Sequence, residues 1–154
     1  MGTASWCMCM RIRRMNFMDV DAVLKVEQEA FTTPWSRAAL EAETSDNELA
    51  YYLVVDDSGT IAGYAGMWLI IDEAHVTNIA LAAAYRGAGL GEKLVRALME
   101  LARERGAVSM TLEVRVSNEK AQSLYAKLGF VPRGTRRSYY TDNREDALIM
   151  WCEL

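Results

Sequence analysis

A glycine-rich turn is the part of the sequence whose residue types and spacing most directly indicate chemistry. It reads Tyr85-Arg86-Gly87-Ala88-Gly89-Leu90-Gly91 and precedes the most regular helical pattern of the chain. Glycine lets a backbone approach a ligand closely, and the first turn of a helix presents N–H groups that have no partner within the helix. Together these features favour phosphate binding. A tight loop that binds no ligand is the alternative when the turn is considered alone.

Two common phosphate-binding motifs do not describe this turn. A P-loop requires Gly-Lys followed by Ser or Thr, and no such run follows Gly89. A dinucleotide-binding fingerprint places its third glycine later and opens a βαβ unit. The turn therefore indicates another kind of anionic ligand.

Hydrophobic periodicity predicts the elements that must position the turn. The predicted helices span residues 20–30, 37–43, 90–105 and 119–128, and the predicted strands span residues 8–15, 49–55, 60–71, 75–81, 109–116, 131–140 and 146–152. The predicted caps are Asp19, Ser36 and Ser117 or Asn118 at helix starts, and Gly106 and Gly129 at helix ends. This order indicates a mixed α/β fold, in which antiparallel strands come first and a β-α-β-α unit carries the turn.

Length and composition indicate one globular domain. The chain has 154 residues, of which 51% are apolar and 25% are charged, and such a composition suits a single packed core. We expect residues 1–9 to form a loose extension and residues 10–154 to form the domain. The longest apolar stretch, residues 65–71, is too short to cross a membrane, and arginines follow residue 10 in the wrong order for a signal peptide. A cytoplasmic protein is therefore expected.

The cysteines indicate neither a metal site nor a disulfide framework. Cys7, Cys9 and Cys152 form no CxxC pair, and His75 is the only histidine of the chain. A structural zinc site needs four ligands of this kind, so we expect no metal and three reduced thiols.

Charge is distributed unevenly along the chain. The net charge is −4; residues 1–75 hold 12 acids and 5 bases, a balance of −7, and residues 76–154 hold 9 acids and 12 bases, a balance of +3. An acidic half suits a cationic peptide and a basic half suits an anionic cofactor, although solvated faces of unequal charge would give the same numbers. No strongly basic face that would indicate nucleic-acid binding is evident.

The turn and its neighbours resemble a known family. Arg86-x-x-Gly89-x-Gly91, after Asn78-Ile79-Ala80-Leu81, is similar to the acetyl-CoA motif of the GNAT superfamily of N-acetyltransferases. Within it, the chain resembles the RimI group of bacterial ribosomal-protein-alanine N-acetyltransferases over about residues 10–152, although that group usually has proline where Ala83 stands. The segments that carry this resemblance are Glu27-Gln28-x-Ala30-Phe31, Pro34-Trp35-Ser36, Leu112-Glu113-Val114-Arg115-Val116-Ser117-Asn118, Leu124-Tyr125, Gly129-Phe130, Arg137-x-Tyr139-Tyr140 and Glu145-Asp146-Ala147.

The resemblance implies a fold and a cofactor. The fold would be a mixed, mostly antiparallel sheet flanked by helices, with central strands that splay to form the acetyl-CoA cleft. The pantetheine arm would pair with the backbone of Ile79, Ala80 and Leu81 as an added strand. The pyrophosphate would lie on the N–H groups of Arg86, Gly87, Ala88, Gly89, Leu90 and Gly91. Asn118 would bond the cofactor near its thioester, and no metal would take part.

The resemblance also implies a reaction. Glu113 would be the general base and Tyr125 the general acid, because their positions match the base and the acid of the family. Trp35, Tyr139 and Tyr140 would flank the N-terminal tail of a protein substrate, as in enzymes that acetylate the N-terminal alanine of ribosomal protein 18 of the small subunit. An α-amine with a pKa of about 7.8 is roughly 14% neutral at pH 7, whereas a lysine amine is about 0.04% neutral, so a carboxylate is an adequate base for the former.

Two alternatives remain open from the sequence. A GNAT enzyme that acts on a small-molecule amine or on lysine would share the cofactor half of the fold, since only the aromatic flanks indicate a peptide. A non-catalytic acyl-CoA-binding module would keep the glycine turn without needing Glu113 or Tyr125. No nucleic acid or membrane partner is expected, and a monomer is the expected state.

Overall fold

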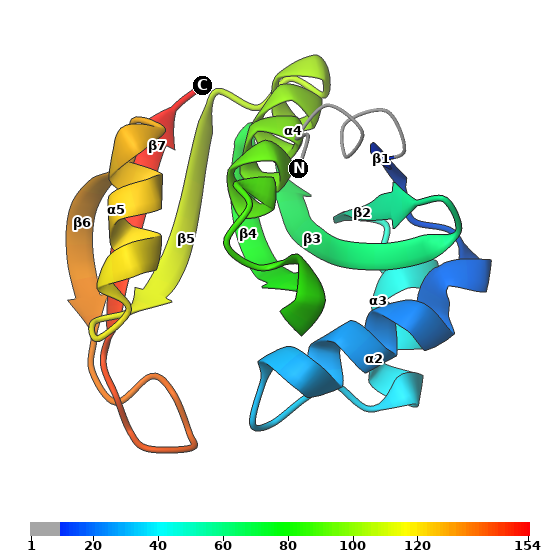
Figure 1. The fold of residues 1–154 in the computed structure, drawn as a ribbon. Helices are drawn as coiled ribbons and strands as arrows, with labels where there is room; N and C mark the ends of the chain where they lie inside the picture. Colours follow the sequence, from blue (N-terminus) through cyan, green and yellow to red (C-terminus); the bar gives the residue numbers. More distant parts are fainter. Residues whose placement is uncertain (1–9) are drawn as a thin grey trace.

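The computed structural model describes residues 10–154, and a single seven-stranded sheet runs through this part of the chain (Figure 1). The strand order is β1-β2-β3-β4-β5-β7-β6. All neighbouring strands are antiparallel except β4 and β5, which are parallel. The strands are β1 (Met10–Arg14), β2 (Ala50–Asp57), β3 (Thr60–Ile70), β4 (Glu73–Leu81), β5 (Ser109–Arg115), β6 (Val131–Arg136) and β7 (Ala147–Glu153).

The sheet divides between β4 and β5. These strands pair only where residues 73–75 of β4 meet residues 109–111 of β5. Beyond this point β4 continues to pair with β3, and β5 continues to pair with β7. Within the described residues, the edge of β4 from Val76 to Leu81 therefore has no strand partner on its β5 side. This confirms the predicted splay of the central strands, which Figure 1 shows as a gap between the green and yellow arrows.

Helices cover both faces of the first half of the sheet. α2 (Val20–Ala30) and α3 (Arg37–Ser45) pack on one face of β2 to β4, and α4 (Leu90–Glu104) packs on the other (Figure 1). α5 (Glu119–Lys127) lies against the second half and has no fully buried residue. Short 3₁₀ turns, η1 (Phe17–Asp19) and η2 (Ala83–Tyr85), precede α2 and α4. No helix within residues 10–154 is long and apolar enough to span a membrane.

The predicted N-cap positions are confirmed, but one of them lacks the capping hydrogen bond. Ser36 caps α3 by accepting a hydrogen bond from the backbone of Ala39, and Asn118 caps α5 in the same way. Asp19 does not cap α2 with its side chain. Its carboxylate instead accepts two hydrogen bonds of 2.8 Å from Arg13 and one of 2.8 Å from the backbone N–H of Asn16.

The predicted strand over residues 131–140 is too long. β6 ends at Arg136, and Ser138 has a left-handed backbone with φ of 49°. Its N–H donates to the carboxylate of Asp146 at 2.8 Å, which turns the chain away from the sheet. Residues 137–146 therefore form a loop, called the β6–β7 loop below. The predicted extension over residues 1–9, with Met8 and Cys9 of the first predicted strand, lies outside the described residues.

Candidate active site

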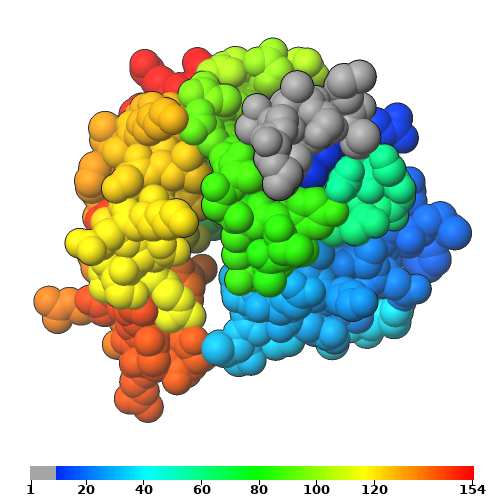
Figure 2. All heavy atoms as spheres, viewed as in Figure 1, coloured from blue at the N-terminus to red at the C-terminus, as the bar shows by residue number. Residues whose placement is uncertain are grey.

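A cavity of about 350 Å³ fills the gap between β4 and β5. Its walls come from residues 76–79 of β4, residues 112–115 of β5, and Asn118, Ala121 and Tyr125 of α5 and its cap. The segment between α2 and α3, residues 31–36, closes one side and is called the α2–α3 loop below. The β6–β7 loop closes the opposite side through Tyr139 and Tyr140. Figure 2 shows this region as an opening between the green, yellow and blue segments.

Glu113 lines the cavity, in agreement with its predicted orientation away from Leu112. The side chains of β5 alternate between the faces of the sheet, and the Glu113 side chain is 9% exposed. Burial would raise the pKa of Glu113, but the hydrogen bond and charge of His75 and the charge of Arg136 outweigh it and hold the pKa below its usual 4.5. Glu113 is therefore a carboxylate at neutral pH.

His75 is a neighbour of Glu113 whose role the sequence did not reveal. Its Nε2 lies 2.8 Å from Oε1 of Glu113, and Arg136 Nε lies 3.5 Å from Oε2. His75 pairs with Thr111 in the short parallel ladder, which brings it two residues from Glu113 along β5. The only available signal was that His75 and Glu113 both lie on strands of the β-α-β unit. The register between those strands cannot be read from the sequence.

Tyr125 faces the same cavity from α5. Its ring packs at a tilt against Phe130, with 5.7 Å between centroids. Within residues 10–154 its hydroxyl makes no hydrogen bond, so it can meet a ligand in the cavity. Burial, assisted by Tyr140, raises the pKa of Tyr125 to about 12. Tyr125 therefore keeps its proton at neutral pH and can donate it.

The free edge of β4 offers backbone groups rather than side chains. Ile79 lines the cavity, whereas Ala80 is 5% exposed and packs into the core beneath α2. Leu81 lies partly buried at the end of the strand, and its carbonyl accepts a hydrogen bond from Arg86 Nε at 3.2 Å. N–H and C=O groups of this edge can pair with an extended ligand, as those of an edge strand do.

The glycine turn lies beside the cavity and does not line it. Gly87 and Gly89 have left-handed backbones, with φ of 84° and 79°, and a Cβ at either would meet no atom within 4 Å. Leu90 begins α4 and is buried. A Cβ at Gly91 would lie 3.9 Å from Leu81 and 4.0 Å from Leu124, which places this turn where β4, α4 and α5 meet. An open, side-chain-free helix start at this place suits a phosphate group.

Asn118 lines the cavity, but part of its side chain is already used. Its Oδ1 accepts a hydrogen bond of 3.1 Å from the backbone N–H of Ala121 as the cap of α5. The amide N–H₂ and the second lone pair of Oδ1 can still meet a ligand. The predicted contact with a cofactor can therefore be a donated or an accepted hydrogen bond.

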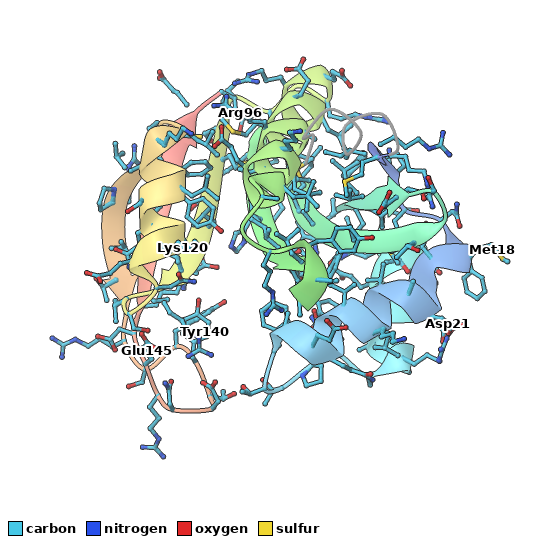
Figure 3. The ribbon with its side chains drawn as sticks, viewed as in Figure 1. Met18, Asp21, Arg96, Lys120, Tyr140 and Glu145 are labelled. Carbon is cyan, nitrogen blue, oxygen red and sulfur yellow. The ribbon has the colours of Figure 1, made fainter. Side chains whose placement is uncertain are left out.

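The three aromatic residues predicted to flank a peptide all line the cavity. Trp35 lies on the α2–α3 loop, where its backbone N–H donates to Glu27 Oε2 at 3.1 Å. Tyr139 and Tyr140 lie on the β6–β7 loop with their rings edge to face, 5.1 Å apart. Figure 3 labels Tyr140 at the margin of the gap, near Glu145 of the same loop.

Glu27 is a buried carboxylate that the sequence did not assign to the site. It is 2% exposed, lines the cavity and also accepts a hydrogen bond from the hydroxyl of Tyr64. Burial raises the pKa of Glu27, although the bonds from Tyr64 and Trp35 oppose that shift. No lysine or arginine within the described residues pairs with it in an ion pair.

The structure thus brings seven of the fifteen predicted site residues to the lining of one cavity. The predicted residues that line it are Trp35, Ile79, Glu113, Asn118, Tyr125, Tyr139 and Tyr140. Ala80, Leu81 and residues 86–91 lie outside this lining, on the side where β4 meets α4. In the part of the chain that the structure describes, no three His, Cys, Asp or Glu side chains group as a metal ion would need.

Comparisons with known proteins show which family the chain belongs to. A protein of Bacillus subtilis (strain 168), named as a candidate ribosomal protein bS18-alanine N-acetyltransferase, is 49% identical over 140 residues, which cover 91% of this chain and 93% of the relative. The ribosomal protein bS18-alanine N-acetyltransferase of Escherichia coli (strain K12) is 37% identical over 141 residues, or 90% and 94% of the two chains. The crystal structure of the Escherichia coli ribosomal-protein-S18-alanine N-acetyltransferase superposes with a TM-score of 0.86 at 35% identity, covering 94% of this chain and 93% of that one. Residues 20–130 match the acetyltransferase (GNAT) family, and the chain belongs to that family.

Proposed function

We propose that this protein transfers an acetyl group from acetyl-CoA to the N-terminal α-amine of another protein. The N-terminal alanine of ribosomal protein bS18 is the proposed acceptor, since relatives of 49% and 37% identity over nine-tenths of the chain carry this substrate in their names. Acetyl transfer from acetyl-CoA is the activity of the family. The expected cytoplasmic location, where ribosomal proteins are made, suits this acceptor.

The residues beside the cavity fit acetyl-CoA. The unpaired edge of β4 supplies hydrogen-bonding groups for an extended amide-containing arm. The open turn at Gly87 and Gly89 leaves room for a pyrophosphate at the start of α4. When bound, acetyl-CoA supplies an acetyl group activated as a thioester. The chain has to orient that group and move two protons.

Glu113 and Tyr125 are suited to those two proton transfers. The new bond joins the amine nitrogen to the acetyl carbon, and the bond from that carbon to sulfur breaks. Glu113, which is charged at neutral pH, takes the proton of the amine directly or through a water. Tyr125 has a pKa of about 12 and is therefore protonated at neutral pH. It gives its proton to the departing thiolate.

The observation that carries the proposal is the shared cavity. A base on β5 and an acid on α5 face one space, which the free edge of β4 bounds on one side and two aromatic loops bound on another. A module that only binds acyl-CoA would not need this pairing. The aromatic loops favour an extended tail over a small-molecule amine.

Acetylation of synthetic peptides tests the proposal. We expect a peptide that begins with a free alanine and contains no lysine to be acetylated faster than an N-terminally blocked peptide with one lysine, and faster than a polyamine. The N-terminal peptide of bS18 should have the highest kcat/KM, and mass spectrometry should find bS18 unmodified in cells that lack this protein. Faster acetylation of lysine or of the polyamine would favour the alternative enzyme.

A further inference from the structure

The two loops that flank the cavity are joined by a direct hydrogen bond. Thr32 Oγ1 donates to Asp142 Oδ2 at 2.9 Å, across 110 residues of sequence. We call this pair the Thr32–Asp142 clasp. Thr32 lies on the α2–α3 loop and Asp142 on the β6–β7 loop. In Figure 2 the light-blue and orange-red atoms that meet below the opening belong to these loops.

Asp142 is also bound by Arg115, a residue of the sheet. Arg115, at the end of β5, donates from Nη2 to Asp142 Oδ2 at 2.8 Å. The other nitrogen of its fork, Nη1, reaches Asn143 at 3.1 Å and Glu145 at 3.3 Å. The Arg115 guanidinium also lies over the ring of Tyr140, 4.0 Å from its centroid. The β6–β7 loop therefore presents Asp142 from a fixed position.

Asp142 remains an acceptor at neutral pH. The hydrogen bond from Arg115 and then that from Thr32 hold the pKa of Asp142 below its usual 3.8. A carboxylate is a stronger acceptor than a neutral oxygen, which strengthens the bond from Thr32.

We propose that the Thr32–Asp142 clasp closes the mouth of the peptide site into a ring, so that Thr32 and Asp142 select amines carried by a free chain end. This inference rests on the proposed function and adds the residues that would set its specificity. The ring consists of β4, β5 and the two loops, whose residues line the cavity from both sides. A tail that begins with the reacting amine can thread the closed ring.

The closed ring restricts access for an internal lysine of a substrate protein more than for a chain end. The substrate chain continues on both sides of an internal lysine and is therefore bulkier at this point than a chain end. Bringing the lysine amine to Glu113 would therefore favour separation of the α2–α3 and β6–β7 loops. Opening breaks the bond from Thr32 to a carboxylate. We expect the loss of one such exposed bond to change the rate by a factor of about five. The clasp would therefore add about this factor to the preference for an α-amine over a lysine.

Substitutions at Thr32 test the clasp. Thr32→Val keeps the branched shape and removes the donor, Thr32→Ser restores a hydroxyl, and Thr60→Val makes the same change at an exposed position on the β2–β3 hairpin. The readout is kcat/KM for an alanine-initiated peptide without lysine, divided by kcat/KM for a blocked peptide with one lysine. We expect Thr32→Val to lower this ratio about fivefold. Thr32→Ser and Thr60→Val should keep the wild-type ratio, and the KM for acetyl-CoA should not change.

The outcomes separate the clasp from the proposed function. An unchanged ratio in Thr32→Val overturns the clasp, including the case in which lysine acetylation stays below detection. Equal losses on both peptides also overturn it, since they indicate a role in stability alone. If the wild-type protein acetylates neither peptide, the proposed function fails and hydrogen exchange decides the clasp. Thr32→Val should then speed exchange in residues 31–36 and 137–146, and unchanged exchange there would reject it.

Discussion

Glu113 and Tyr125 are expected to fail in different ways when their functional groups are removed. Glu113→Gln should still bind acetyl-CoA but lose about 10²-fold or more in kcat/KM at neutral pH, the usual scale for a general base. That loss should shrink at high pH, because solvent then supplies the neutral amine as pH passes its pKa of about 8. Steady-state profiles from about pH 6 to 9.5, a range set by these reference pKa values, measure the recovery.

Tyr125→Phe provides the contrast for this assignment. The thiolate needs a proton at every pH, so the defect of this variant should persist where that of Glu113→Gln recovers. Tyr125 is well placed for such a comparison because its ring packs against Phe130, a contact that phenylalanine keeps. Wild-type rates in Glu113→Gln at neutral pH would end the case for Glu113 as the base.

Some partners of these residues could be predicted from the sequence and others could not. Alternation along residues 109–116 predicted the face of Glu113, and the helical stripe that includes Leu124 predicted that of Tyr125. His75 and Arg136 come from β4 and β6, so their proximity to Glu113 depends on strand pairing between distant segments. Such registers follow from the whole packing of the sheet and leave no local signal.

Among the elements, the start of α4 is expected to bind the cofactor's phosphates. Gly89→Glu should abolish acetyl-CoA binding, because it places a side chain and a like charge where the pyrophosphate would lie. Gly59→Glu is a matched control, since Gly59 also has a left-handed backbone and open space around its Cα, at the far β2–β3 hairpin. Calorimetry should show binding lost in the first variant and kept in the second. Loss in both would indicate general damage rather than a lost site.

The β6–β7 loop shows where sequence reasoning about elements fails. The strand pattern through residues 131–140 is continuous, but a left-handed Ser138 and its bond to Asp146 end the strand early. The aromatic pair Tyr139 and Tyr140 thereby leaves the sheet and reaches the cavity. β-propensity does not report such a turn, because the side chain that causes it lies eight residues away.

At the scale of the whole molecule, the pair of Arg13 and Asp19 is expected to make stability depend on pH. The hydrogen bonds from Arg13 hold the pKa of Asp19 below its usual 3.8, so its stabilising effect is present above that pH and is lost as pH falls through the lower folded value. Asp19→Asn should therefore lower the urea midpoint at pH 7, and the difference from wild type should begin to narrow below about pH 4. Asp46→Asn, at the exposed end of α3, is the control. A difference that stays constant with pH would contradict this account.

The sheet has two halves, β1 to β4 and β5 to β7, which pair with each other only at one end of β4 and β5. Among residues 10–154, strand pairing connects the two halves only between residues 73–75 and 109–111, while a shared hydrophobic core and the ion pair of Lys127 with Glu92 also link them. A cofactor that pairs with β4 and contacts α5 would link the two halves of the protein. Because it binds the folded chain alone, cofactor at a hundred times its Kd should add about 2.7 kcal/mol to stability. The enzyme would then be most resistant to heat and proteases when it is loaded with acetyl donor.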